Sequence, residues 1–251
     1  MKSIDLNADL GEGMGFDKEL LEIISSASIA CGGHAGDDET MAKTLTAAKK
    51  ANVVTGAHPG FEDRKNFGRK QLDISASQMG EITVEQIKTI CTIADEVGQK
   101  ISYVKLHGAL YNLASKDFAY AKTIFSAIKK FDKSLAILAM DNSAQLRAAK
   151  ELGFKTIHEA FADRAYQKNG LLLSRKFDGA VFDRVEMAVD QVLSIAQNNK
   201  ITSYDGFEIS SSANSICLHG DNKAALKLAN AIKLALENAG IKIAAPVLNQ
   251  D

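Results

Sequence analysis

Short runs of apolar residues alternate with longer amphipathic stretches along the chain. The short runs are typical of strands, and the stretches between them repeat apolar residues at the spacing of one helix face. The predicted strands cover residues 3–9, 27–32, 53–58, 102–108, 135–140, 155–161 and 215–220. The predicted helices cover residues 38–51, 75–98, 117–131, 141–153, 180–198 and 222–240. This alternation predicts a mostly parallel sheet, either open and doubly wound or closed into a barrel.

Polar side chains on one face of two predicted strands decide between these architectures. Asp5, Asn7 and Asp9 alternate with apolar residues in the first strand, and Lys105 and His107 share one face of the fourth. A strand inside an open parallel sheet is buried on both faces and is almost entirely apolar. A closed barrel can instead direct one face of each strand inward, toward a site at its C-terminal mouth. We therefore predict a (β/α) barrel, formed as a single domain over residues 1–251 because no linker-like segment divides the chain.

Composition narrows the classes of function. The 251 residues carry a formal net charge of −1, with neither a basic cluster nor a long apolar run, so we expect no nucleic-acid or membrane partner. The first ten residues place acids where a signal peptide would be apolar. Three widely spaced cysteines suit reduced thiols better than disulfides. These features predict a cytoplasmic protein.

The histidines coincide with the predicted strand ends. All five lie at or just after the C-terminal end of a strand: His34, His58, His107, His158 and His219. Active sites of β/α barrels lie at this end of the strands. Any one histidine could equally be a hydrogen-bonded structural residue, but together they predict one shared site.

The acids of the first strand are a second candidate feature. Asp5, Asn7 and Asp9 would face inward, with Glu12 in the glycine-rich loop above them. Neighbouring carboxylates push their pKa values apart, so that one can act as an acid, or they can bind a cation. In the structural alternative, Asp5 and Asn7 only form bonds within the barrel, for instance to Lys105.

Nucleotide and serine-hydrolase motifs do not fit this sequence. The glycines at positions 11, 13 and 15 do not match the GxGxxG spacing, and neither GxxxxGK[ST] nor GxSxG occurs. Two basic loops, at residues 60–70 and 160–170, follow predicted strands and could instead hold a carboxylate or phosphate, or be solvated surface. Their candidate binding residues are Arg64, Arg69, Asp163 and Arg164.

Six sequence blocks resemble the LamB/YcsF family in order and spacing. They read DLNADLGEG, ACGGHAGD, GAHPGFEDRKNFGR, VKLHGALYN, EAFADRAY and LHGDN, between residues 5 and 222. The resemblance implies a distorted (β/α) barrel with about seven parallel strands, related to the glycoside hydrolase/deacetylase group. Characterised members of the family are the A subunit of ATP-hydrolysing 5-oxoprolinase. The resemblance therefore also implies cleavage of the lactam of 5-oxo-L-proline to L-glutamate, with subunits B and C as partners and ATP, with Mg²⁺, bound on or shared with them.

We assign the candidate residues hypothetical roles in this expected reaction. Asp9 and Glu12 are the candidate base and acid. The remaining candidate catalytic residues are Asp5, Asn7, His58, Lys105 and His107. The candidate substrate- or phosphate-binding residues are His34, Arg64, Arg69, Asp163, Arg164 and His219.

Two other functions stay open at this point. One is a metal-dependent amide or carbohydrate hydrolase or deacetylase of the same barrel group, with Asp9, His34 and His58 on a divalent cation. The other is a subunit that binds a small molecule or carbohydrate without catalysis. Replacing Asp9 separates the second from an enzyme, because a binding subunit would keep its complex fully active.

Overall fold

A closed barrel of parallel strands forms the centre of the molecule. The computed structural model describes residues 2–218 and 223–246. Within them, seven strands form the barrel: β1 (Ser3–Leu10), β2 (Ser26–Ala30), β3 (Val54–His58), β4 (Ile101–Val104), β5 (Ala136–Met140), β6 (Thr156–Phe161) and β9 (Ser215–Leu218). Each strand pairs with the next in this order, and β9 pairs with β1 to close the barrel. The predicted barrel and its predicted strands are confirmed.

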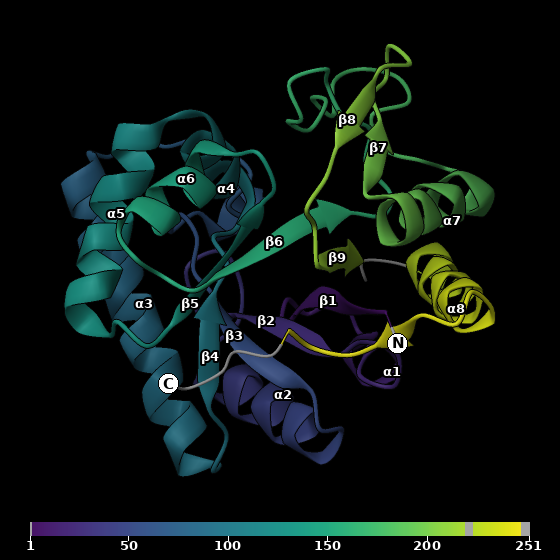
Figure 1. Cartoon of the computed structure of the whole chain (residues 1–251). Coiled ribbons are helices and arrows are strands. Elements are labelled where there is room, and N and C mark those ends of the chain that lie inside the picture. Colours follow the sequence, from purple (N-terminus) through teal and green to yellow (C-terminus); the bar gives the residue numbers. More distant parts are fainter. Residues whose placement is uncertain (1, 219–222, 247–251) are drawn as a thin grey trace.

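Helices surround the barrel (Figure 1). They are α1 (Asp17–Leu20), α2 (Asp38–Lys50), α3 (Ala76–Glu96), α4 (Gly108–Lys116), α5 (Phe118–Phe131), α6 (Ala144–Glu151), α7 (Val185–Leu193) and α8 (Lys223–Asn238). Figure 1 shows α3, α5 and α6 together on one side and α7 with α8 on the other. The six predicted helices are present, whereas the short α1 and α4 were not predicted. In the described part of the chain, no helix has the length and apolar character needed to cross a membrane.

A long excursion separates β6 from β9. Besides α7 it contains a π-helical turn (Ser194–Asn198) and an antiparallel hairpin of β7 (Lys200–Thr202) and β8 (Glu208–Ser210). The hairpin projects from the barrel at the top of Figure 1. A final short strand, β10 (Lys242–Ile243), pairs with the start of β1.

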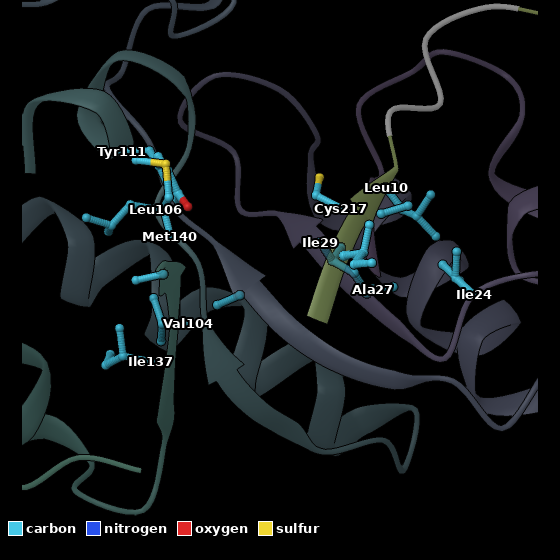
Figure 2. Packing of buried hydrophobic residues seen from close by; sticks show 14 of the residues in the cluster. Leu10, Ile24, Ala27, Ile29, Val104, Leu106, Tyr111, Ile137, Met140 and Cys217 are labelled. Atoms are coloured by element: carbon cyan, nitrogen blue, oxygen red, sulfur yellow. The ribbon is translucent and has the colours of Figure 1, made fainter. Parts of the chain in front are cut away.

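The outward faces of the strands form the main apolar core. Leu10, Ala27, Ile29, Val104 and Ile137 each expose 1% or less of their surface and belong to one cluster with residues of the surrounding helices. Figure 2 shows these side chains on neighbouring strands. Burying a large aliphatic side chain contributes about 1.5–3 kcal/mol to stability, so this layer holds the helices on the barrel.

A separate apolar cluster fills part of the barrel interior. Tyr103, Ala136, Leu138 and Ile157 are buried inside, on the alternate positions of their strands. Gly56 on β3 makes room for the aromatic ring, because a Cβ at this position would lie 2.3 Å from the ring of Tyr103. The inward positions nearer the strands' C-terminal ends are polar, which leaves a charged layer at the mouth.

Candidate active site

Six polar side chains meet at the C-terminal mouth of the barrel. They are Asp9 at the end of β1, Glu12 in the following loop, His34 in the loop after β2, His58 at the end of β3, and Lys105 and His107 after β4. The three histidines and the lysine expose 6% of their surface or less, whereas the two acids are partly exposed. The structure thus brings together three histidines and two acids that the sequence placed in one site.

The local backbone explains how these side chains reach the mouth. Gly11 has a φ of 74°, a left-handed conformation that bends the chain so that Glu12 returns over the barrel. The N–H of Gly11 donates to the carboxylate of Asp17 at 2.9 Å, which fixes this turn. Beyond β4, the backbone N–H groups of Lys105 and His107 donate to backbone carbonyls at the end of β3 and just after it. Both side chains therefore stay level with His58.

Lys105 is the centre of a buried charge network. Its Nζ lies 2.9 Å from Asp9 and 2.8 Å from Glu159, and it donates to Asn7 Oδ1 at 3.2 Å. Burial alone would lower the pKa of Lys105, but the carboxylates outweigh it and hold the pKa well above its ordinary value. Lys105 is therefore a permanent cation rather than a nucleophile.

The pKa values of the two mouth carboxylates are shifted in opposite directions. Burial would raise the pKa of Asp9, but the charges of His58 and Lys105 hold it well below the ordinary value. Burial and the neighbouring charge of Asp9 raise the pKa of Glu12. Asp9 is therefore the ionised member at neutral pH, and Glu12 holds a proton more readily.

Backbone carbonyls fix the protonation of two histidines. His58 Nδ1 lies 2.8 Å from the carbonyl of Lys105, and His107 Nε2 lies 2.9 Å from that of Phe67, so both of these nitrogens must donate. The opposite nitrogens, His58 Nε2 and His107 Nδ1, face each other at 3.0 Å. Burial lowers the pKa of His107 to about 3, whereas Asp9 raises that of His58 against the effect of burial. The shared proton therefore belongs to His58.

Four of the mouth residues could also hold a metal ion. Glu12, His34, His58 and His107 each offer one ligand atom, and these atoms lie within 4.8 Å of one another. This group contains two of the three metal candidates from the sequence and has Glu12 in place of Asp9. The Asp9 carboxylate stays close, with Oδ2 3.3 Å from His58 Nε2.

The chain matches the model of the LamB/YcsF family over residues 4–250. It belongs to this family. A relative from Campylobacter jejuni subsp. jejuni serotype O:6, named as the A subunit of 5-oxoprolinase, is 42% identical over 250 residues, which cover 98% of each chain. A solved structure from Thermus thermophilus, named lactam utilization protein, superposes with a TM-score of 0.91 at 33% identity and covers 98% of this chain and 100% of that one.

The wider barrel group is recognisable by fold alone. A deacetylase solved with its substrate superposes on this LamB/YcsF chain with a TM-score of 0.52 at 14% identity, covering 96% of this chain and 87% of that one. The expected relation to deacetylase-like barrels is therefore confirmed for the architecture, and at this identity it says nothing about the chemistry.

Glu159 is a site residue of this LamB/YcsF protein that sequence reasoning missed. It is fully buried on β6, where it pairs with Lys105 and accepts a hydrogen bond from the Tyr111 hydroxyl at 2.7 Å. A signal was present, because Glu159 is an acid inside a predicted strand and shares its face with the apolar Ile157 and Phe161. The sequence analysis assigned the adjacent His158 to the site instead, although neighbouring side chains on a strand point to opposite faces.

The basic loops divide into a rim and a structural part. Arg64 and Arg69 are exposed. Burial and the charge of His58 are larger causes of the lowered pKa of His34, and the charges of the two nearby arginines lower it further. Arg164 is buried and donates to the carbonyls of Ala180 and Leu173, at 3.1 and 2.7 Å. Arg164 therefore holds together the segment that follows β6. The neighbouring Asp163 is also buried, and its backbone carbonyl accepts a hydrogen bond from the N–H of residue 182 in the same segment, at 2.8 Å.

Asp5 forms hydrogen bonds within the barrel, as in the structural alternative suggested by the sequence, but its expected partner Lys105 is wrong. Its carboxylate accepts hydrogen bonds from the hydroxyls of Ser25, Ser26 and Ser215. The register places Asp5 opposite Ser215 on β9, deeper in the barrel than the lysine. Asn7 joins the two layers, because it donates to Ser215 Oγ at 2.8 Å and accepts from Lys105.

Asp5 makes stability depend on pH. Burial raises its pKa from 3.8 to about 6, against the opposing effect of the serine hydrogen bonds. The folded protein then holds this proton more tightly than the unfolded chain, so the contribution is complete below about pH 4 and is lost as the pH rises through 6. Compared with Asp5→Asn, the wild type should lose about 2–3 kcal/mol between pH 4 and pH 7, because its pKa differs by about 2 units between the folded and unfolded states and each unit is worth about 1.4 kcal/mol. Denaturant unfolding measures this difference, and parallel pH curves for the two proteins would contradict it.

His158 does not join the mouth cluster. His158 lies on the outer face of β6, where its Nδ1 is 2.7 Å from Ser212 Oγ and 3.3 Å from Asp141 Oδ1. The expectation that it shares the site is wrong, because the inward position on β6 belongs to Glu159. His219 lies outside the described residues.

Proposed function

We propose that this chain is the lactam-cleaving subunit of an ATP-dependent 5-oxoprolinase, which converts 5-oxo-L-proline to L-glutamate. The names of its relatives support this assignment, since one is named as the A subunit of 5-oxoprolinase and another as a lactam utilization protein. The observation that carries it is the mouth itself, where an ionised Asp9, the cationic Lys105 and three histidines surround one point.

The chemistry of the substrate requires such a constellation. A five-membered lactam is a stable amide, and phosphorylation of its oxygen by ATP, with release of ADP, would activate its carbon. Water then adds to this carbon and gives its proton to an acceptor, and the ring C–N bond breaks as a donor protonates the nitrogen. A second water hydrolyses the resulting acyl phosphate to L-glutamate and phosphate. Asp9 is ionised and available as the acceptor, Glu12 is the carboxyl group that holds a proton more readily, and Lys105 stabilises negative charge.

The rim of the mouth supplies groups for the substrate's own charge. We assign Arg64 and Arg69 to the carboxylate of 5-oxo-L-proline or to the phosphate, because both lie by the mouth and arginine grips such groups in a bidentate manner. Arg69 stacks over the ring of Phe67 at 5.2 Å, which holds it at the rim. Arg164 is less suited, since two carbonyls occupy its guanidinium.

Partner subunits complete the reaction in this proposal. The chain carries none of the phosphate-binding motifs sought in its sequence. ATP, with Mg²⁺, is therefore assigned to the partner subunits B and C or to a site shared with them. The word subunit in the names of the relatives agrees with a multisubunit enzyme.

The assignment predicts that activity depends on the partners. The purified chain alone should form no glutamate from 5-oxo-L-proline and ATP, whereas the chain co-purified with subunits B and C should form glutamate and ADP together. Quantifying both products in the two preparations is the test. Robust ATP-dependent turnover by the isolated chain would contradict the division of labour, and no glutamate from the complete mixture would contradict the function.

A further inference from the structure

Three ligand-type atoms at the mouth form a triangle of the size that a tetrahedral metal ion requires. His58 Nε2 and His107 Nδ1 are 3.0 Å apart, and Glu12 Oε1 lies 3.4 Å from His107 Nδ1 and 3.9 Å from His58 Nε2. Ligands held about 2.1 Å from a tetrahedral Zn²⁺ are about 3.4 Å from one another. The mean edge of this triangle fits that value.

Both histidines have the second hydrogen bond that metal-binding imidazoles need. A metal-ligating histidine normally donates its other ring N–H to a carbonyl or carboxylate, which fixes its tautomer and orientation. His58 Nδ1 and His107 Nε2 do this toward the carbonyls of Lys105 and Phe67. Their opposite nitrogens face each other at 3.0 Å, so either the proton assigned to His58 or a cation in its place must lie between them. The two rings are perpendicular, at 89°, so both lone pairs can point at one position.

His34 has a different place in this arrangement. Its ring is stacked on that of His107, with centroids 3.5 Å apart and planes 2° from parallel. Two parallel rings cannot both hold one ion in their planes. His34 Nε2 instead lies 2.9 Å from Glu12 Oε1, where it can donate a hydrogen bond and orient the carboxylate.

We propose that Glu12, His58 and His107 bind one divalent transition-metal ion of the Zn²⁺ class, with His34 as a positioning residue. Two histidines and one glutamate form a known catalytic zinc set, which leaves a coordination position open. This set differs from the one expected from the sequence, in which Asp9 and His34 were ligands beside His58. The catalytic meaning of the site rests on the proposed function: an ion here would supply Lewis-acid polarisation of the lactam carbonyl, and Glu12 would then be a metal ligand instead of the proton donor.

Metal binding can be measured on the purified full-length chain without any lactam. After treatment with a chelator and its removal, the chain is titrated with Co²⁺ and followed by the visible absorption of the bound ion, then with Zn²⁺ in competition. Elemental analysis gives the stoichiometry. We expect one ion per chain, displaced by Zn²⁺, and an increase in melting temperature with Zn²⁺.

Variants separate the proposed ligands from the rest of the chain. His107→Ala and Glu12→Gln should each weaken binding at least about 100-fold, whereas His158→Ala on the outer face should bind like the wild type. Glu12→Gln keeps the side-chain size at a partly exposed position, so it tests the proposal even if His107→Ala does not fold.

The outcomes are independent of the proposed function. No saturable Co²⁺ or Zn²⁺ binding, or wild-type affinity in Glu12→Gln, overturns the metal site. Because the titration contains no lactam or ATP, glutamate formation by the assembled enzyme can succeed or fail separately from it.

Discussion

Replacing Asp9 with asparagine should lower the turnover of 5-oxo-L-proline by about 10²–10⁴-fold in the assembled enzyme, the usual contribution of a general acid–base group. Asp9 is held ionised by Lys105 at 2.9 Å and His58 at 3.3 Å, so its carboxylate is available to take a proton from water. Asparagine keeps the shape of the side chain but cannot take that proton. The measurement is kcat from glutamate release, with the melting temperature and subunit composition as checks on folding and assembly.

Glu19→Gln is the matched control for this substitution. Glu19 is an exposed carboxylate on α1, so its amide variant should retain wild-type turnover. If Asp9→Asn is as active as this control, Asp9 is not the proton acceptor and the acids of β1 are architectural. A subunit that only binds a small molecule would give the same result, so the comparison also decides between enzyme and binding subunit.

Replacing Lys105 with methionine should lower the free energy of unfolding by about 3–5 kcal/mol. Lys105 is 2% exposed, and its ammonium is the cation between Asp9 and the fully buried Glu159. Methionine has a similar length but no charge, so the variant leaves a carboxylate buried without its counter-charge. Denaturant unfolding of the wild type and Lys105→Met measures the difference.

The double variant Lys105→Met/Glu159→Gln identifies the cause of this loss. Removing the stranded charge of Glu159 should recover part of the stability that the single variant loses, because an amide costs less to bury than an unpaired carboxylate. A single variant that loses less than about 1 kcal/mol, or a double variant less stable than the single one, would contradict the role of the buried pair.

The barrel and much of its mouth could be predicted from the sequence because they follow from local periodicity. Alternation in the first strand places Asp5, Asn7 and Asp9 on one face regardless of what lies opposite. Glycine-flanked histidines after strands likewise indicate the mouth, and His34, His58 and His107 do meet there.

Pairings between strands could not be predicted in the same way. Whether Lys105 meets Asp5 or Glu159 depends on depth in the barrel, and four residues of a strand span about 13 Å. The register sets Asp5 level with Ser215, far below the mouth, and this register involves residues 210 positions apart. The hairpin of β7 and β8 was also missed, because its strands have three residues each and no alternation long enough to detect.

The central claim is that the lactam binds in the mouth of the barrel, and histidine NMR tests it most directly. The chain, 27.0 kDa in mass, is labelled with ¹⁵N and ¹³C in its histidine rings and titrated with 5-oxo-L-proline. Single histidine variants assign the signals. We predict saturable shifts of the His58 and His107 signals and no shift of the signal of His158, which lies on the outer face. Saturable binding that moves His158 and leaves the mouth histidines unchanged would contradict the account.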